Sequence, residues 1–331
     1  MSKSRRMSSK SNQVGVKRLA PIAVFAFRRL SLLRETLSAL EQCDGFQSSP
    51  IHIFSDAARA ELKDEVDAVT EVRTWLKEWC DVHGAELREA PVNQGLRSSI
   101  TSGVAALLRD YDRVIVLEDD IVVSQSFISF MNQALDAYEN QSNVVQVSGY
   151  FVPHKERLPP VGFLGVPACW GWATWARAWR HYRDDAPALL AEVRERDVNR
   201  FDIGGSYGYL DALERNAAGT LNTWLVRWYA SVFLVGGLAV YPARSLTRNI
   251  GFGEEGTNCG PGTMAHVFAT QPIHAMPAKV DWTSLTVEET PSFSKALQRF
   301  YEWQQQQWVK PTWAARIGAR LKLAFGIDVP A

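Results

Sequence analysis

Short apolar runs alternate with helical patterns over the first half of the chain. The runs of strand length lie at 19–27, 51–54, 113–117 and 144–147. Patterns with apolar residues three and four apart fill 32–42, 60–83 and 98–109, and another begins after Ser124. Such alternation predicts βαβ units joined by right-handed crossovers. We therefore expect an α/β fold whose sheet is mostly parallel and flanked by helices.

Charged residues follow three of these apolar runs. Arg28 and Arg29 follow the first run, Asp56 follows the second, and the triplet Glu118-Asp119-Asp120 follows the third. In open α/β sheets, ligands bind beyond the carboxyl ends of the strands. The sequence therefore predicts a binding site where these charged residues converge.

The acidic triplet is the most informative motif. Three adjacent carboxylates after a buried strand repel one another unless a cation lies among them. A hard divalent ion such as Mg²⁺ takes one or two carboxylates together with phosphate oxygens and water. The alternative is a solvated acidic turn, but the flanking strand RVIVL and the following IVVS favour a metal site.

The composition narrows the function further. The 331 residues include 36 Lys+Arg and 36 Asp+Glu, so the net charge is zero and a general nucleic-acid binder is disfavoured. No apolar run of transmembrane length occurs, and the four cysteines have neither zinc-site nor disulfide-scaffold spacing. We expect a cytoplasmic globular protein with no nucleic-acid partner.

The tryptophans allow two interpretations. Trp172, Trp175 and Trp179 are spaced as on one face of a helix, which favours core packing for most of them. Gly171, between two tryptophans, permits close approach of a ligand to the backbone. Sugars stack their apolar C–H faces on aromatic rings, so Trp170, Gly171 and Trp172 could form an acceptor platform. Trp224, on a later predicted helix, carries the same two interpretations.

A glycine-rich segment spans 251–262, with five glycines in twelve residues. Loops that close over substrates need flexible segments of this kind. An ordinary surface loop is the alternative.

Several segments, taken in order, resemble one enzyme family. The string VIVLEDDIVVSQSFISF at 114–130 resembles the metal-binding segment of GT-A glycosyltransferases. It is similar to the branch that includes N-acetylglucosaminyltransferase I and bacterial family 2 relatives, which uses a Glu-Asp-Asp version of the DxD motif. The stretch 93–96, Asn-Gln-Gly-Leu, resembles the family's NxGL turn, and 24–40 resembles the segment that opens the nucleotide site. The resemblance runs from about 21 to 262 and implies a Rossmann-like GT-A fold, with a C-terminal helical extension beyond it.

The resemblance also implies roles for individual residues. Asp120 would contact the metal, Mn²⁺ or Mg²⁺, that bridges the donor phosphates. Asp119 would hold the ribose and Glu118 the donor sugar, so Asp120 and Glu118 are the candidate catalytic residues. The other candidates for donor binding are Arg29, Asp56, Asn93, Gly95 and Arg248, with structural ion pairs as the alternative for the arginines. The candidates for acceptor binding are Trp170, Gly171, Trp172 and Trp224.

The chain departs from the family pattern at the position of the general base. An inverting transferase needs a base to take the proton of the acceptor hydroxyl. The relatives have an aspartate just before the helix that resembles TWLVRW, whereas this chain has Asn222. A histidine of the glycine loop and an aspartate near 201–207 are also replaced. The carboxylates that could substitute are Asp202, Asp211, Glu254 and Glu255.

The predicted organisation has three parts. Residues 1–18 are a basic leader, predicted disordered, and 19–265 are the GT-A domain, with a nucleotide-sugar half at 19–150 and an acceptor half at 151–265. Residues 266–331 are a C-terminal extension. There Trp313, Ile317, Leu321 and Phe325 lie on one face of a basic amphipathic helix. Such a helix either contacts an anionic membrane surface or packs on the catalytic domain.

The resulting prediction is a metal-dependent glycosyltransferase, inverting by resemblance, that moves a hexose or N-acetylhexosamine. The donor would be a UDP- or GDP-linked sugar and the acceptor a glycan or a lipid-linked molecule. Three alternatives stay open at this point: a catalytically weakened relative that binds the donor, a tryptophan-rich carbohydrate-binding protein, and a metal-dependent phosphohydrolase.

Overall fold

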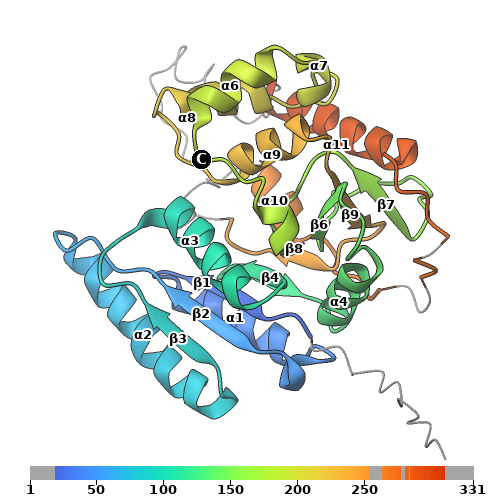
Figure 1. The fold of residues 1–331 in the computed structure, drawn as a ribbon. Coiled ribbons are helices and arrows are strands. Elements are labelled where there is room, and N and C mark those ends of the chain that lie inside the picture. Colours follow the sequence, from blue (N-terminus) through green and yellow to red (C-terminus); the bar gives the residue numbers. More distant parts are fainter. Residues whose placement is uncertain (1–18, 253–262, 277–279, 283, 310–331) are drawn as a thin grey trace, which may run out of the picture.

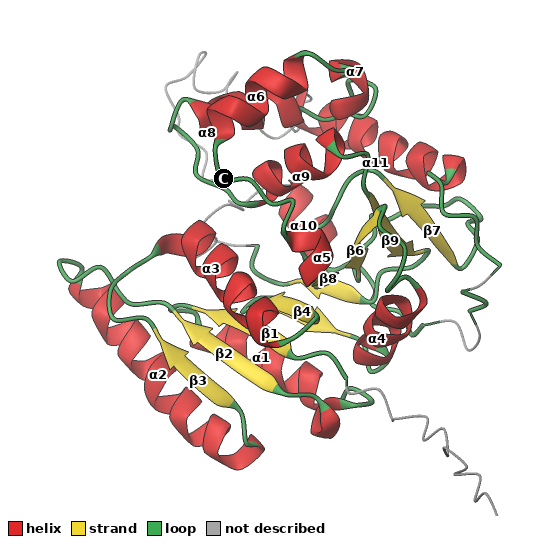
Figure 2. Cartoon of the chain, viewed as in Figure 1, coloured by secondary structure: helices red, strands yellow, loops and turns green. Residues whose placement is uncertain are grey.

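A computed structural model describes residues 19–252, 263–276, 280–282 and 284–309. Three predictions fall outside these residues. They concern the leader 1–18, most of the glycine-rich segment, and the basic amphipathic helix with Trp313, Ile317, Leu321 and Phe325. Figure 1 shows the arrangement of the described elements, and Figure 2 shows helices on either side of the central sheet.

The described secondary structure alternates as the sequence predicts in the first half. The strands are β1 Ile22–Ala26, β2 Ile51–Ser55, β3 Glu86–Glu89, β4 Arg113–Glu118, β5 Ile121–Val123, β6 Val144–Ser148, β7 Val161–Leu164, β8 Trp172–Trp175, β9 Leu238–Pro242 and β10 Thr247–Asn249. The helices are α1 Leu30–Glu41, the 3₁₀ turn η1 Phe46–Ser48, α2 Lys63–His83, α3 Gly95–Asp110, α4 Phe127–Ala137, α5 Ala176–Trp179, α6 Ala186–Arg194, α7 Val198–Phe201, α8 Tyr209–Ala217, α9 Leu225–Leu234, α10 Thr263–Ala269 and α11 Pro291–Val309.

The main sheet has eight strands in the order β3-β2-β1-β4-β8-β6-β9-β7. The pairs β3–β2, β2–β1, β1–β4 and β6–β9 are parallel. Strand β8 is antiparallel to both β4 and β6, so β4 and β6 point the same way. Only β8 and β7 run against the other six strands. The predicted α/β class with a mostly parallel sheet is thus confirmed.

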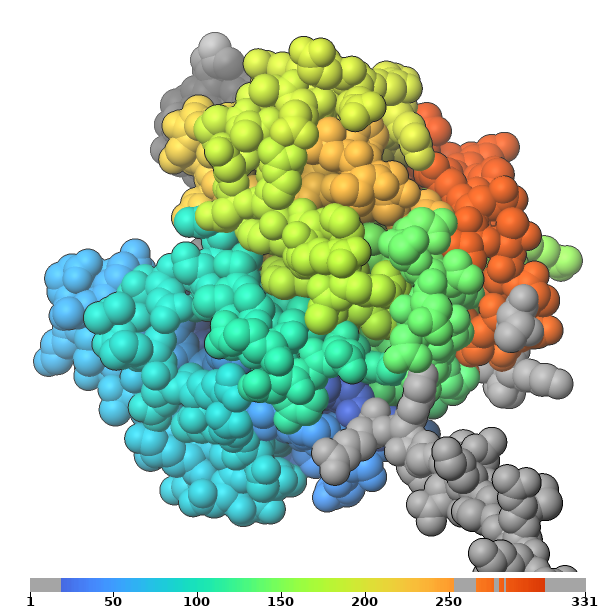
Figure 3. Space-filling model, in the orientation of Figure 1, coloured from blue at the N-terminus to red at the C-terminus, as the bar shows by residue number. Residues whose placement is uncertain are grey.

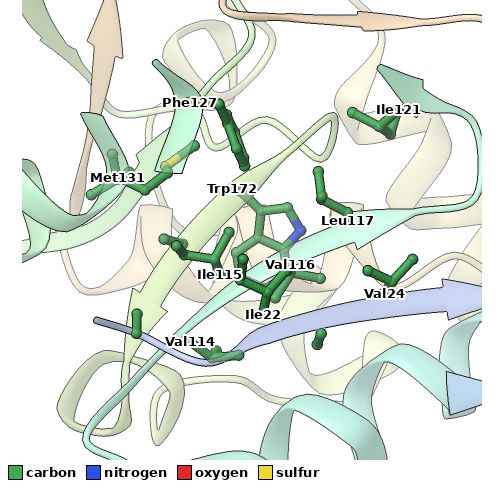
Figure 4. Close-up of a cluster of buried hydrophobic side chains, with 14 of the residues drawn as sticks. Ile22, Val24, Val114, Ile115, Val116, Leu117, Ile121, Phe127, Met131 and Trp172 are labelled. Carbon is green, nitrogen blue, oxygen red and sulfur yellow. The ribbon is translucent and has the colours of Figure 1, made fainter. Parts of the chain in front are cut away.

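The core lies on both sides of the central strands. Every residue of β1 is buried, and the inner residues of β4 are fully buried. Figure 4 shows Trp172 of β8 lying among Ile115, Val116 and Leu117 of β4. Helices α1 and α4 contribute apolar faces to this cluster, as their spacing predicts.

The second half of the chain continues the same sheet. Helices α6 to α9 gather with α11 at the top of Figure 1, over a second buried cluster. Figure 3 shows the blue-to-teal first half and the green-to-orange second half packed against each other. The sequence pattern suggests that strand and helix alternation fades after residue 150, but β7, β8 and β9 all join the main sheet.

The prediction that Trp172, Trp175 and Trp179 share one helix is wrong. Trp172 and Trp175 belong to strand β8, and only Trp179 lies in the short helix α5. Trp175 donates from Nε1 to the carbonyl of Leu135 in α4, at 3.1 Å, whereas the ring of Trp172 packs toward Trp179. Residues three apart on a strand face opposite sides of the sheet, which explains this divergence.

Candidate functional site

One edge of the sheet collects most of the predicted site residues. The carboxyl ends of β1, β2, β4 and β6 all lie there because these strands are parallel. The amino end of antiparallel β8 lies at the same edge, preceded by Trp170 and Gly171. The topology therefore brings together Arg29, Asp56, the acidic triplet and the tryptophan segment.

Arg29 is held between two carboxylates of the triplet. Its Nη2 contacts Oδ1 of Asp119 and lies 2.9 Å from Oδ2 of Asp120. All three side chains are largely buried, with exposed fractions of 14%, 5% and 10%. Thr36 of α1 adds a hydrogen bond to the carbonyl of Asp119, at 3.0 Å. The loop before α1 and the turn after β4 are thereby fixed to each other.

The carboxyl groups of this cluster outnumber its one guanidinium. If all three carboxylates of the triplet were ionised, their charge would exceed that of Arg29 by two in a largely buried setting. Burial and the charges of Asp120 and Asp119 raise the pKa of Glu118 to about 8. Burial also raises the pKa of Asp119 to about 6, although Arg29 counteracts this shift. Burial raises the pKa of Asp120 in the same direction.

The two-stranded sheet of β5 and β10 closes over the triplet. Asn249 pairs with Ile121, and the amide of Ile250 donates to the carbonyl of Asp120 at 2.9 Å. Gly251 comes so close that a Cβ atom there would lie 2.0 Å from Oδ2 of Asp120 and 2.8 Å from Nη1 of Arg29. Only glycine allows this approach. The sequence marks Gly251 as the start of a loop but not as a contact of the triplet.

Arg248 lies on β10, where its backbone pairs with Val122 of β5. Its Nε is buried and has no hydrogen-bond partner among the described residues. A buried donor without a partner is rare in folded proteins and calls for a ligand or water. The role of Arg248 in donor binding stays a prediction, because no described contact joins its side chain to the triplet.

Asp56, Asn93 and Gly95 form one turn at the end of β2. Oδ1 of Asp56 accepts from the amides of Ala57 and Gln94, and its Oδ2 accepts from the amide of Gly95, at 2.8 to 2.9 Å. Asn93 donates from Nδ2 to the carbonyl of Ala57 at 2.6 Å. These bonds fix the turn that begins α3 beside the site.

The four candidates for acceptor binding differ in burial. Trp172 and Trp224 are 0% and 3% exposed and stack on each other with ring centroids 5.1 Å apart. A sugar needs an accessible ring face, so core packing accounts for these two residues and corrects the prediction that they contact an acceptor. Gly171 has φ +76°, a left-handed conformation, and its backbone lies against Thr247. Of the three tryptophans among these candidates, Trp170 alone stays partly exposed.

The site fits a divalent cation bound through few protein ligands. Within the described ranges, no three His, Cys, Asp or Glu side chains converge to hold a metal by themselves. A Mg²⁺-like ion in a nucleotide site needs only one or two carboxylates. Oδ1 of Asp120 is buried and has no hydrogen-bond partner among the described residues. The residues of the triplet therefore fit a cation chemically, and the ligand role of Asp120 stays a prediction.

The carboxylates considered as replacement bases are not all available. Asp202 uses Oδ1 to accept from the amide of Leu210 at the start of α8, at 2.7 Å. Asp211 is exposed on α8, within 4.0 Å of Arg215. Asn222 is exposed in the segment before α9. Glu254 and Glu255 lie outside the described residues.

Comparisons with known proteins find similar solved structures but no protein that is related in sequence. No protein-family profile and no curated protein matches the chain. The mannosyltransferase PcManGT from Pyrobaculum calidifontis, solved with GDP-Man and Mn²⁺, is 9% identical over 67% of this chain and 70% of its own, with a TM-score of 0.37. GalNAc-T7, solved with UDP, GalNAc and Mn²⁺, is 10% identical over 68% of this chain and 42% of its own, with a TM-score of 0.42. S. aureus TarS 1–349 is 8% identical over 69% of this chain and 59% of its own, with a TM-score of 0.40.

The match spans less than two thirds of the GalNAc-T7 and TarS chains. At these identities and TM-scores the likeness carries no argument about function. Within the described residues, no helix has the length and apolar content needed to span a bilayer.

Proposed function

We propose that this chain is a GT-A glycosyltransferase that uses a nucleotide-activated sugar and a divalent cation. The observation that carries the proposal is the acidic triplet at the end of β4, with three carboxyl groups beside one guanidinium and an oxygen of Asp120 that has no partner among the described residues. A divalent cation bound there supplies charge stabilisation to the departing nucleoside diphosphate.

Different residues of the chain would bind different parts of the donor. Asp120 would ligate the cation, and Arg29 would hold the carboxylates of Asp119 and Asp120 in place. Arg248 has a free Nε with which to donate to a phosphate oxygen, a strong charge-assisted bond. Glu118 keeps some exposed surface, so it is the carboxylate of the triplet that a donor sugar can reach. Asp119 would contact the ribose, which is the role that the resemblance implies, although in this structure its carboxylate pairs with Arg29.

The turn at the end of β2 is our candidate for the contact with the nucleoside. Strand β1 separates β2 from β4, so the turn of Asp56, Asn93 and Gly95 is offset from the triplet by two strand spacings, about 10 Å. An offset of this size supports the proposal, since a nucleoside bound by its phosphates at β4 could extend toward this turn. We propose that the turn shapes the pocket for the base.

A second candidate is a relative that binds the donor and transfers slowly. Asn222 stands where the resembling enzymes have an aspartate, and an amide cannot accept a proton as a general base. A carbohydrate-binding protein without a nucleotide site has less support, because Trp172 and Trp224 are buried in the core.

The test is release of nucleoside diphosphate from UDP- and GDP-sugars, with water accepting the sugar, measured with Mn²⁺ and with EDTA. We expect release that needs Mn²⁺ in the wild type and is lost in Asp120→Asn, which keeps the size of the side chain and removes its charge. Asp67→Asn, at an exposed position on α2, is the matched control and should behave as the wild type. Mn²⁺-dependent release by Asp120→Asn at the wild-type rate would contradict the metal assignment. Nucleotide binding without release favours the second candidate.

A further inference from the structure

A cavity of about 190 Å³ opens at the edge of the sheet opposite to the acidic triplet. Its lining includes Leu164, the last residue of β7, and Gly237, which directly precedes β9. Strands β4, β6 and β9 point the same way and β7 runs against β9, so the end of β7 lies at the other edge from the end of β4. Strand β7 is also four strands away from β4, about 20 Å across the sheet. The cavity is therefore separate from the proposed donor site.

Apolar groups form the walls of this cavity. Helices α7, α9 and α11 surround the end of β7, in the upper part of Figure 1. The hydroxyl of Tyr229 already donates to the carbonyl of Phe201 at 2.8 Å, so only the ring of Tyr229 is available to a ligand. None of the buried polar atoms in the side chains of this lining, which lies wholly within the described residues, lacks a hydrogen-bond partner. The apolar side chains of the lining are Leu164, Val166, Ile203, Tyr229, Phe233 and Leu297.

The polar side chains of the lining lie at its mouth and are paired. Arg200 and Glu289 are both exposed, with Nη2 and Oε2 3.3 Å apart. Ser294 donates from Oγ to Oε1 of Glu289 at 3.3 Å, and Gln298 donates to Glu302 at 3.0 Å. Because the two opposite charges at the mouth offset each other, the cavity favours a ligand without net charge.

The turn after α7 places a strained residue in the wall of the cavity. Ile203 has φ +53° and is the one left-handed residue other than glycine in the described part of the chain. A β-branched residue in this region is an outlier that persists only where its surroundings hold it. Ser206, which is buried, donates to the carbonyl of Ile203 from its amide at 3.3 Å and from Oγ at 2.7 Å. Outliers of this kind recur at ligand sites.

We propose that this cavity binds an uncharged aromatic molecule with a single substituted ring. An apolar cavity of about 150 Å³ holds one benzene molecule, so a space of about 190 Å³ admits a ring with a small substituent. Small-molecule sites are typically apolar cavities with a few polar groups at defined positions. The ring packs against Phe233 and Leu297, and a hydroxyl on the ring meets the polar mouth. The proposal does not depend on the proposed transferase function.

The test is binding of p-cresol to the full chain, measured by NMR of protein with ¹³C-labelled methyl groups. We expect nuclear Overhauser contacts from p-cresol to the methyl groups of Leu164, Val166 and Leu297. Benzoate, which carries a charge on a similar ring, should bind at least about tenfold more weakly, because burying a charge without a partner is costly.

A matched pair of variants tests the location. An added Cβ at Gly165, in the lining, meets no atom within 4 Å, so Gly165→Leu should fold and take up space that the ligand needs. We expect it to lower the affinity for p-cresol by at least about tenfold. Gly208→Leu is the control, because Gly208 lies outside the lining and a Cβ there meets only Asp211, at 3.9 Å. If Gly165→Leu does not fold, Ser294→Leu narrows the same cavity from α11.

Four results would overturn the proposal. The wild type may bind no p-cresol up to its solubility limit, or the contacts may involve only exposed side chains such as Leu62 and Val82, which would indicate adsorption to the surface. Equal affinity in the cavity variant and in Gly208→Leu would place the ligand elsewhere. Benzoate that binds as tightly as p-cresol would refute an uncharged ligand. Nucleotide binding plays no part in these measurements, so failure of the proposed function is distinguishable from failure of this site.

Discussion

Replacing Arg29 by glutamine should destabilise the protein in a way that depends on pH and on metal. The substitution removes the one positive charge between two nearly buried aspartates. Breaking a buried ion pair by removing one partner costs about 3–5 kcal/mol. We expect a loss of this size at pH 8 in EDTA, where the carboxylates of the triplet are ionised most fully.

The sign of the pH dependence follows from the raised pKa values. Glu118 shifts from 4.5 to about 8 and Asp119 from 3.8 to about 6, so the folded protein holds more protons than the unfolded chain between pH 4 and 8. Stability therefore falls as pH rises through that window. Without Arg29 the fall should steepen, and the penalty should shrink at pH 5, where protons replace the missing positive charge.

The assay is urea unfolding at pH 5 and pH 8, each with EDTA and with Mn²⁺. Mn²⁺ should restore part of the lost stability, since a cation bound to the folded state stabilises it. The matched control is Arg113→Gln, which also removes an arginine between two acids, but with partners about 40% exposed. It should cost no more than about 1 kcal/mol and respond to neither pH nor Mn²⁺. If Arg29→Gln and Arg113→Gln lose the same stability and respond alike to pH and Mn²⁺, the charge argument is refuted. If Arg29→Gln does not fold, Arg29→Lys, which keeps the charge, replaces it in the same unfolding assay.

Two other substitutions test the geometry of the site and of its surroundings. Gly251→Ala would place a Cβ 2.0 Å from Oδ2 of Asp120, so nucleotide affinity in Mn²⁺ should fall about tenfold to a hundredfold. The control is Gly165→Ala, which should leave nucleotide affinity unchanged because no atom lies within 4 Å of the added Cβ. Equal affinities by calorimetry would contradict the close approach of Gly251. Hydrogen bonding to Arg59 lowers the pKa of the nearly buried Glu65 to about 2, so its stabilisation is present above pH 4.5 and is lost as pH falls toward 2. The stability gap between wild type and Glu65→Gln should close over that range in acid unfolding curves, and a gap independent of pH would contradict this contact.

The sequence predicts the first half of the fold well because its strands are buried. The runs at β1, β2, β4 and β6 are apolar, and their carboxyl ends carry the charged residues that meet at one edge. Strand β3 escapes prediction because it is an edge strand whose residues, Glu-Leu-Arg-Glu, are exposed or half-buried. Its pattern lacks the apolar run that identifies a buried strand.

The second half is harder to predict because its signals are ambiguous. The spacing of Trp172, Trp175 and Trp179 fits one face of a helix, yet the first two lie on opposite faces of a strand. Short aromatic runs do not distinguish the two structures by periodicity alone.

One close neighbour of the acidic triplet leaves almost no signal in the sequence. Gly251 matters because β10 brings its backbone against Asp120, a contact between residues more than 120 positions apart. This contact depends on a long-range strand pairing that a local pattern does not contain.

Calorimetric titration of UDP and GDP into the full chain, first with Mn²⁺ and then with EDTA, tests the central claim most directly. If the triplet holds a cation beneath the donor phosphates, at least one nucleotide will bind with Mn²⁺, and its affinity will collapse in EDTA. Binding of neither nucleotide with Mn²⁺, or equal affinity in Mn²⁺ and EDTA, would contradict the account.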